Sequence, residues 1–211
     1  MAVSVGFAEI GPHERYKLLC ATIVPRPIAL VTTLDSAGIV NAAPFSFFNV
    51  FSEEPALVVL GLQHKPDRDR KDTTRNIAET GTFVVNLVDE ALAEAMNVCA
   101  IDFPPGTSEI DAAGLSLAPS QDVPVPHIAD APFAFECRRT ASLAFGPDRE
   151  ILIGEVLRLH ARDGLLDLAR LRVSTEQYKP VGRLFGSSYS RQSERFDLVK
   201  QSYPEWLDGK A

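Results

Sequence analysis

The sequence A-F-E-C-R-R-T-A-S-L-A-F at residues 134–145 is followed, after a Gly-Pro-Asp turn, by E-I-L-I-G-E-V-L-R-L-H-A-R at residues 150–162. Along the second segment, apolar side chains such as Ile151 and Ile153 alternate with charged ones such as Glu155. Alternation with a period of two is typical of a strand with one buried face. The two segments therefore predict a long antiparallel β-hairpin.

Shorter β-rich runs precede this hairpin. I-A-L-V-T-T-L at residues 28–34 is continuous and apolar, which is typical of a strand buried on both faces. The turn residues D-S-A-G at 35–38 lead into a second strand over residues 39–48, so these runs predict another hairpin. Further strands are predicted over residues 56–62 and 82–88.

Helices are expected at only a few places. Apolar spacing and capping residues predict helices over residues 12–23, 72–79 and 89–99, a helix-like stretch near 165–171 and a charged helix around 194–201. Most strands therefore follow one another without an intervening helix. Because a doubly wound parallel sheet needs such helices, we expect a mainly β protein, an antiparallel barrel with peripheral helices.

The 211 residues are expected to form a single domain over residues 1–211. A Pro-rich, mostly irregular excursion over residues 101–132 interrupts the strands, and a tail over residues 180–211 follows them. Connections as long as this excursion are usually functional, so it is a candidate cover for a site.

Composition narrows the classes of function. With 21 Lys and Arg against 28 Asp and Glu, the formal net charge is −7, which argues against a general nucleic-acid or anionic-membrane surface. The first residues lack the pattern of a signal peptide, and no apolar run approaches a membrane span. Cys20, Cys99 and Cys137 are too few and too far apart for a disulfide framework. We therefore expect a cytoplasmic protein with reduced thiols.

Several common active-site motifs are absent from the sequence. It contains no G-x-G-x-x-G after a strand, no G-x-x-x-x-G-K-[ST], no H-E-x-x-H and no G-x-S-x-G. The four histidines are widely separated, which argues against a metal site. No metal ligand and no catalytic residue is therefore assigned.

The segment N-A-A-P-F-S-F-F-N at residues 41–49 has the composition of a wall for a planar polar ring. Its small side chains let a flat ring approach the backbone, and Ser46 and the asparagines can hydrogen-bond the edge of a heteroaromatic ring. The alternative is an ordinary barrel strand with Phe45 and Phe47 in the core.

Residues 63–76 are rich in cations just before a predicted helix start. Lys71 and Thr73 stand at that start, with Arg68 and Arg75 close in sequence. Helix N-terminal N–H groups, a hydroxyl and a cation together make a phosphate site, although a solvated charged loop is the plainer alternative. Taken together, the two segments describe a site for a planar ring with a terminal phosphate, such as FMN.

The same segments resemble a known family. The matching blocks are R-P-I-A-L-V-T-T (26–33), G-x-V-N-A-A-P-F-S-F-F-N (38–49), K-D-T-x-x-N-I (71–77), F-V-V-N-L-V (83–88), V-P-x-P-H-I-A-D-A-P-F-A-F-E-C (123–137), I-G-E-V (153–156) and V-G-R-L-x-G-x-x-Y-x-R (181–191). In this order they resemble the flavin reductase-like, FMN-binding split-barrel flavoproteins, over roughly residues 12–195.

The resemblance implies a Greek-key split β-barrel that forms a homodimer, with FMN in a cleft near the subunit interface. By position, the resemblance places Thr32 and Thr33 along the flavin, and it places six residues on the ring or ribityl chain: Asn41, Ala42, Ala43, Ser46, Phe48 and Asn49. The phosphate is expected to contact His64, Lys65, Lys71 and Thr73. Tyr189 and Arg191 are expected to close the pocket from the other subunit.

The resemblance also implies an oxidoreductase in which hydride passes from NAD(P)H through bound FMN to free flavin or another small acceptor. The block A-A-P-F-S-F-F at residues 42–48 differs from the Ser- and Thr-rich version of many two-component reductases, and it suits the branch in which FMN stays bound. One alternative is an FMN-binding electron carrier without NAD(P)H activity. Another is a cofactor-free barrel used for interactions.

Overall fold

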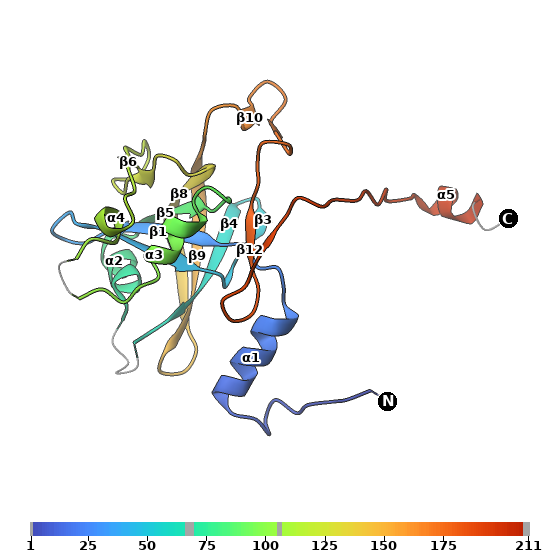
Figure 1. Ribbon diagram of the computed structural model, residues 1–211, viewed down its shortest axis with the longest axis horizontal. Coiled ribbons are helices and arrows are strands. Elements are labelled where there is room, and N and C mark those ends of the chain that lie inside the picture. The colour runs from blue at the N-terminus through green and yellow to red at the C-terminus, as the bar shows by residue number, and fades with distance from the viewer. Residues whose placement is uncertain (1, 66–69, 105–106, 209–211) are drawn as a thin grey trace.

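The computed structural model describes residues 2–65, 70–104 and 107–208. Its centre is a seven-stranded antiparallel sheet with the strand order β2-β1-β5-β8-β9-β4-β3 (Figure 1). The strands of this sheet are β1 (Ala29–Leu34), β2 (Val40–Phe45), β3 (Phe48–Glu53), β4 (Ala56–Gln63), β5 (Thr82–Leu87), β8 (Phe133–Ala144) and β9 (Arg149–Ala161). The expectation of a mainly β protein is therefore confirmed.

Shorter elements surround the sheet. Two-stranded ladders pair β6 (Leu117–Ala118) with β7 (His127–Ile128), β10 (Leu166–Asp167) with β11 (Arg172–Val173), and β12 (Val181–Arg183) with β13 (Tyr189–Arg191). The helices are α1 (Pro12–Thr22), α2 (Asp72–Thr80), α3 (Ala93–Val98), α4 (Glu109–Ala112) and α5 (Tyr203–Asp208). Within the described ranges, none of these helices combines the length and apolar character needed to cross a membrane.

The two edge strands of the sheet are consecutive in the chain. Strand β2 ends at Phe45 and β3 begins at Phe48, so only Ser46 and Phe47 connect them. Seven strands laid flat would separate β2 from β3 by about 29 Å, whereas this link spans at most about 11 Å. The sheet must therefore curl until its edges approach each other. At this seam, the backbone N–H of Gly61 in β4 donates to the Phe47 carbonyl at 2.7 Å.

Strand β1 is buried on both faces, as its continuous apolar sequence predicts. On one face, Ala29 and Val31 belong to an apolar cluster that includes Phe83 of β5. On the other face, Leu30 belongs to a second cluster that includes Met96 of α3. Strand β1 thus lies between the apolar cluster inside the barrel and the apolar cluster that packs against α3.

The predicted hairpin of β8 and β9 is confirmed, and it contains one unusually close approach. Phe83 is fully buried in the barrel interior. A Cβ atom added to Gly154 of β9 would lie only 2.4 Å from Cζ of the Phe83 ring. The absence of a side chain at Gly154 therefore lets the ring pack directly against the strand backbone.

Helices α1, α2 and α3 confirm three of the expected helices, although α3 covers only the second half of the predicted range 89–99. Helix α2 ends at Gly81, whose φ of 72° lies in the left-handed region that glycine adopts readily. The strand expected within residues 39–48 is confirmed as β2, which ends at Phe45 before the chain starts β3 at Phe48.

Two predicted helices are wrong. Residues 165–171 contain β10 and a turn, in which the Asp167 carboxylate accepts backbone N–H groups of Ala169 and Arg170. Residues 194–201 form no helix, and α5 begins only at Tyr203. Figure 1 shows this tail running away from the barrel, so its periodic apolar residues have no core against which a helix could form.

The described part of the excursion over residues 101–132 contains only the short elements α4, β6 and β7, and a buried carboxylate anchors its far end. Glu136 of β8 is fully buried. Its carboxylate accepts backbone N–H groups of Gln121, Asp122 and Val123 at 2.8, 2.6 and 2.9 Å, and it lies 2.5 Å from Nε2 of His160. One side chain thereby fixes three successive backbone groups of the loop to the barrel.

These contacts decide the protonation state of Glu136. Burial by itself raises the pKa of a carboxyl group, but here the backbone N–H groups and His160 outweigh burial and hold the pKa of Glu136 below its ordinary value. A lowered pKa means that the ionised form stabilises the fold above the pKa of the unfolded chain. This contribution is lost as the pH falls through the folded-state pKa.

We expect Gly154→Ala to lower the free energy of unfolding by about 1–3 kcal/mol, because the added methyl group overlaps the buried Phe83 ring. Urea denaturation at neutral pH measures this loss. Gly6→Ala is the matched control, since a Cβ atom there would meet only the flexible end of Glu9. Equal losses in the two variants would contradict the packing argument.

We expect Glu136→Gln to lower the free energy of unfolding at neutral pH by about 1–3 kcal/mol, because the amide cannot satisfy all the backbone donors. The difference from the wild type should shrink as the pH falls through the lowered folded-state pKa of Glu136, where the wild-type carboxylate becomes protonated. Urea denaturation across this pH range tests both statements, with the exposed Glu53→Gln as control. A difference that does not change with pH would rule out the role of the charge.

Candidate functional site

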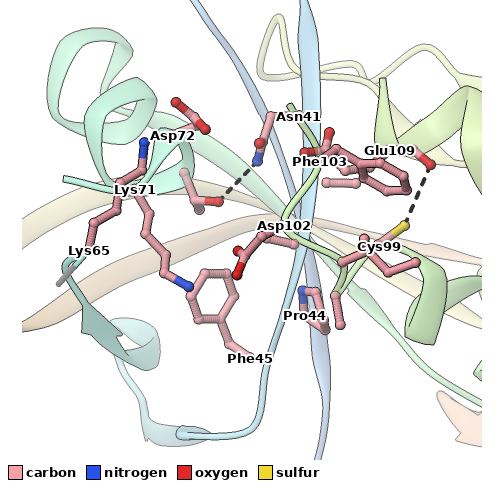
Figure 2. Close-up of a pocket in the computed structure, with 15 residues that line it drawn as sticks. Asn41, Pro44, Phe45, Lys65, Lys71, Asp72, Cys99, Asp102, Phe103 and Glu109 are labelled. Atoms are coloured by element: carbon pink, nitrogen blue, oxygen red, sulfur yellow. Dashed lines mark hydrogen bonds between the residues drawn. The ribbon is translucent and has the colours of Figure 1, made fainter. Parts of the chain in front are cut away.

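A cavity of about 640 Å³ lies between β2, the start of α2 and the near end of the excursion. We call it the main cavity. Its lining residues are Asn41, Ala42, Ala43, Pro44, Phe45, Lys65, Lys71, Asp72, Thr73, Cys99, Ala100, Ile101, Asp102, Phe103 and Glu109. Figure 2 shows Lys65 and Lys71 on one side of this cavity and Cys99, Phe103 and Glu109 on the other.

Strand β2 forms the floor of the main cavity. Its side chains there are small, and Ala42 is fully buried. The Asn41 amide donates a hydrogen bond to the Thr73 hydroxyl at 3.0 Å, which ties β2 to the first turn of α2 (Figure 2). In the main sheet β2 pairs only with β1, so the backbone groups along its other edge have no strand partner there. Such an edge offers donors and acceptors to a flat polar ligand.

Cations gather where α2 begins. Lys71 is the residue before the first helical residue, and Lys65 lines the same end of the main cavity. The acidic Asp72 is paired with Arg75, so its charge is already compensated. Lys71 takes part in no ion pair among the described residues. The N-terminal N–H groups of a helix and a nearby lysine side chain favour a bound anion. Arg68, also expected in this basic segment, lies outside the described residues.

The near end of the excursion forms the opposite wall of the main cavity, through residues 99–103 and Glu109. These residues were not among the sequence-based site candidates. The only signal for them was the unusual length and proline content of the excursion. Burial, with Glu109 close by, raises the pKa of the Cys99 thiol to about 11, so the thiol stays protonated and packs as an apolar group.

A second hollow of about 420 Å³ adjoins the main cavity. The two share Pro44, Phe45 and Lys71, and the second hollow is also lined by Ser46 and Tyr16. The segment predicted to hold a planar ring therefore passes from one hollow into the next.

The structure brings together several of the predicted cofactor-binding residues and leaves others elsewhere. Asn41, Ala42, Ala43, Lys65, Lys71 and Thr73 line the main cavity, and Ser46 lines the second hollow. Thr32 and Thr33 are fully buried behind this wall. The Thr32 hydroxyl donates to the Pro126 carbonyl at 2.8 Å, and the Thr33 hydroxyl accepts from the Asn76 amide at 3.0 Å. Both threonines thus support the site from within the barrel wall.

The remaining predicted residues line neither hollow. Phe48 packs against the barrel interior, Asn49 is exposed, and His64 lies 3.7 Å from the buried Glu150. Tyr189 and Arg191 lie on β13. There the Arg183 guanidinium stacks on the Tyr189 ring at 4.5 Å from its centroid, and Arg191 donates to Glu90 at 3.0 Å.

This arrangement is suited to binding more than to acid–base chemistry by the protein itself. A strand edge with small side chains can hold a planar ring, and the lysines at the start of α2 can hold an anion. Both features meet in one cavity of ligand size.

Comparison with known proteins agrees with this geometry. The sequence profile of the "Flavin reductase like domain" family matches residues 21–182. The chain superposes with a TM-score of 0.88 on the crystal structure of 2-nitrobenzoate 2-nitroreductase NbaA from Pseudomonas fluorescens. The two sequences are 39% identical, and the match covers 95% of this chain and 98% of that one. The chain is 36% identical to nitrilotriacetate monooxygenase component B from Bacillus cereus, with a TM-score of 0.88 over 94% and 99% of the two chains.

A more distant match concerns the fold alone. A structure from Shewanella frigidimarina, described as having a split barrel domain, superposes with a TM-score of 0.78 at 17% identity, over 92% of this chain and 96% of that chain. The curled sheet with its two consecutive edge strands is therefore the split barrel that the sequence resemblance implied.

Proposed function

Because this chain belongs to the flavin reductase-like domain family, we propose that it is an FMN-dependent oxidoreductase that takes its reducing equivalents from NAD(P)H. The observation that carries the proposal is the main cavity, where the free edge of β2 lies together with Lys71, a lysine at a helix start that forms no ion pair with any described residue. When bound, the flavin would supply the redox chemistry, hydride transfer from NAD(P)H and delivery to free flavin or another small acceptor.

The residues at the start of α2 fit the phosphate of FMN. Lys71 and Lys65 supply positive charge, and the first residues of α2, whose N–H groups have no partner within the helix, line the same end of the main cavity. The Asn41 amide occupies one lone pair of the Thr73 hydroxyl oxygen, which leaves the hydroxyl proton available to a phosphate oxygen. A phosphate here would receive charge-assisted hydrogen bonds, which are stronger than neutral ones.

The floor of the main cavity fits the flavin ring. The free edge of β2 can exchange hydrogen bonds with the polar edge of the ring, and the small Ala42 and Ala43 allow a close approach. The ring would extend past Phe45 toward Ser46 in the second hollow, because Pro44, Phe45 and Lys71 line both hollows. Along this path the chain would position the ring and exclude water from its faces.

The site also supports proposals about partners. The similar proteins bear the names of a nitroreductase and of a monooxygenase component, which supports a small-molecule electron acceptor for this chain as well. We propose a homodimer in which Tyr189 and Arg191 reach the flavin of the second copy, since neither residue lines the main cavity of its own chain. The exposed Val50 and Phe51 on β3 offer an apolar surface for such an assembly. The cysteines are all unpaired, which supports the cytoplasm as the compartment.

We expect Lys71→Ala to weaken FMN binding roughly ten- to hundredfold, because it removes a charge-assisted hydrogen bond to the phosphate. Riboflavin lacks the phosphate, so its affinity should stay unchanged in the same variant. Titration of flavin fluorescence measures both affinities.

The matched control for this titration is Lys200→Ala, which removes an exposed lysine from the tail. If Lys71→Ala weakened FMN and riboflavin equally, the phosphate would not lie at the start of α2. If purified protein bound neither flavin, the proposed function would be rejected.

We expect protein loaded with FMN to lose its visible flavin absorbance when NADH or NADPH is added without oxygen. Stopped-flow absorbance records this bleaching, and buffer with FMN but no protein is the control. Flavin that stays bound but is not reduced by either nucleotide would favour the electron carrier over the oxidoreductase.

A further inference from the structure

Arg26 is a buried cation without an anionic partner. Its exposed fraction is only 7%. The guanidinium donates to the carbonyls of Cys20, Ile23 and Leu184 at 2.7, 2.9 and 2.9 Å, and more weakly to the Ser46 hydroxyl at 3.4 Å. Among the described residues, no carboxylate pairs with it. Buried charges in proteins are usually paired, so this one indicates that an anion belongs nearby.

A pocket of about 280 Å³ lies beside Arg26, between α1 and the turn that follows β12. We call it the cationic pocket. Its lining residues are His13, Tyr16, Lys17, Cys20, Arg26, Arg183, Leu184, Phe185 and Gly186. No Asp or Glu is among these residues. Neither His13 nor Lys17 forms an ion pair with any other residue that the structure describes.

The other guanidinium of the cationic pocket, that of Arg183, also pairs with no carboxylate in the part of the chain that the structure describes. Arg183 donates to the Gly186 carbonyl at 2.5 Å and stacks on the Tyr189 ring. Lys17, Arg26 and Arg183 therefore place three permanent positive charges around one small pocket. In a chain whose net charge is −7, this local excess of positive charge would attract small anions selectively.

Tyr16 joins the cationic pocket to the second hollow. It lines both, and its ring lies 6.3 Å from the ring of Phe47. Burial, with a contribution from Cys20, raises the pKa of Tyr16 against the opposing effect of Arg26 and Arg183. The phenol therefore stays protonated and can donate a hydrogen bond to an anion.

Arg26 makes a second connection between the cationic pocket and the flavin site. Its Nε donates to Ser46, which lines the second hollow, where the end of the flavin ring is proposed to lie. The pocket is thus separated from that ring by single side chains. A molecule with its anionic end in the pocket could present its remaining atoms to the flavin.

We propose that the cationic pocket binds the oxyanion of the second substrate, a carboxylate of a small organic acid or a phosphate of the nicotinamide nucleotide. This assignment rests on the proposed function for its role in the reaction, but the anion site itself does not depend on bound flavin. The volume fits the anionic end of a ligand with at most a small ring, which Tyr16 and Phe185 would contact.

The test uses isothermal titration of the whole protein, with and without FMN, with benzoate and inorganic phosphate as separate probes. Lys17→Glu and Arg183→Gln should each weaken the tighter-binding probe by about tenfold or more, because each removes a charge from the pocket. Arg170→Gln is the matched control, since Arg170 is exposed and lies outside the pocket. Arg26 is not substituted, because its hydrogen bonds also hold the end of α1.

The two probes distinguish the sources of the anion. Tighter binding of benzoate would indicate a small organic acid, and tighter binding of phosphate would indicate the nucleotide. The proposal is overturned if neither probe binds, or if Lys17→Glu and Arg183→Gln bind both probes as the wild type does. Loss of FMN binding with intact, variant-sensitive probe binding would reject the proposed function and leave the anion site in place.

Discussion

The two-residue link between β2 and β3 is the constraint on which the rest of the structure depends. Because Ser46 and Phe47 must join the opposite edges of a seven-stranded sheet, the sheet closes on itself but stays unpaired along β2. The free edge of β2 then faces the start of α2 and the excursion, and the main cavity forms between them. The same link carries Ser46, so the closure of the barrel also sets the distance between the main cavity and the cationic pocket.

Positively charged side chains gather around this site although the chain as a whole is acidic. The protein carries a net charge of −7, yet Lys65 and Lys71 stand at one end of the main cavity, and the cationic pocket lies beyond the other hollow. Local fields of this kind concentrate small anions without making the whole surface basic. The anion sites that we propose at Lys71 and in the cationic pocket therefore need no excess of positive charge over the chain as a whole.

The sequence predicted correctly those strands and helices whose hydrophobic pattern matches the side chains that they bury. The run over residues 28–34 is apolar throughout and its strand is buried on both faces, and the first half of β9 shows the alternating burial that its sequence predicts. The helix expected over 165–171 failed because Asp167 bonds the following backbone and forms a turn. The composition of 41–49 and the cations near Lys71 indicated the floor and one end of the main cavity, whereas its other wall, residues 99–103, is brought there only by tertiary packing. No local pattern marks such a contact.

The attachment of the excursion has an evolutionary consequence. Glu136 fastens residues 121–123 to the barrel, while the cavity wall itself comes from residues about twenty positions earlier in the chain. One part of the excursion therefore attaches it to the barrel, and a different part forms the wall of the main cavity. Insertions or exchanges between the anchor and the wall can change which molecules fit the main cavity without altering any strand of the main sheet. Descendants of one such ancestor can diversify their substrates by changing a single replaceable loop.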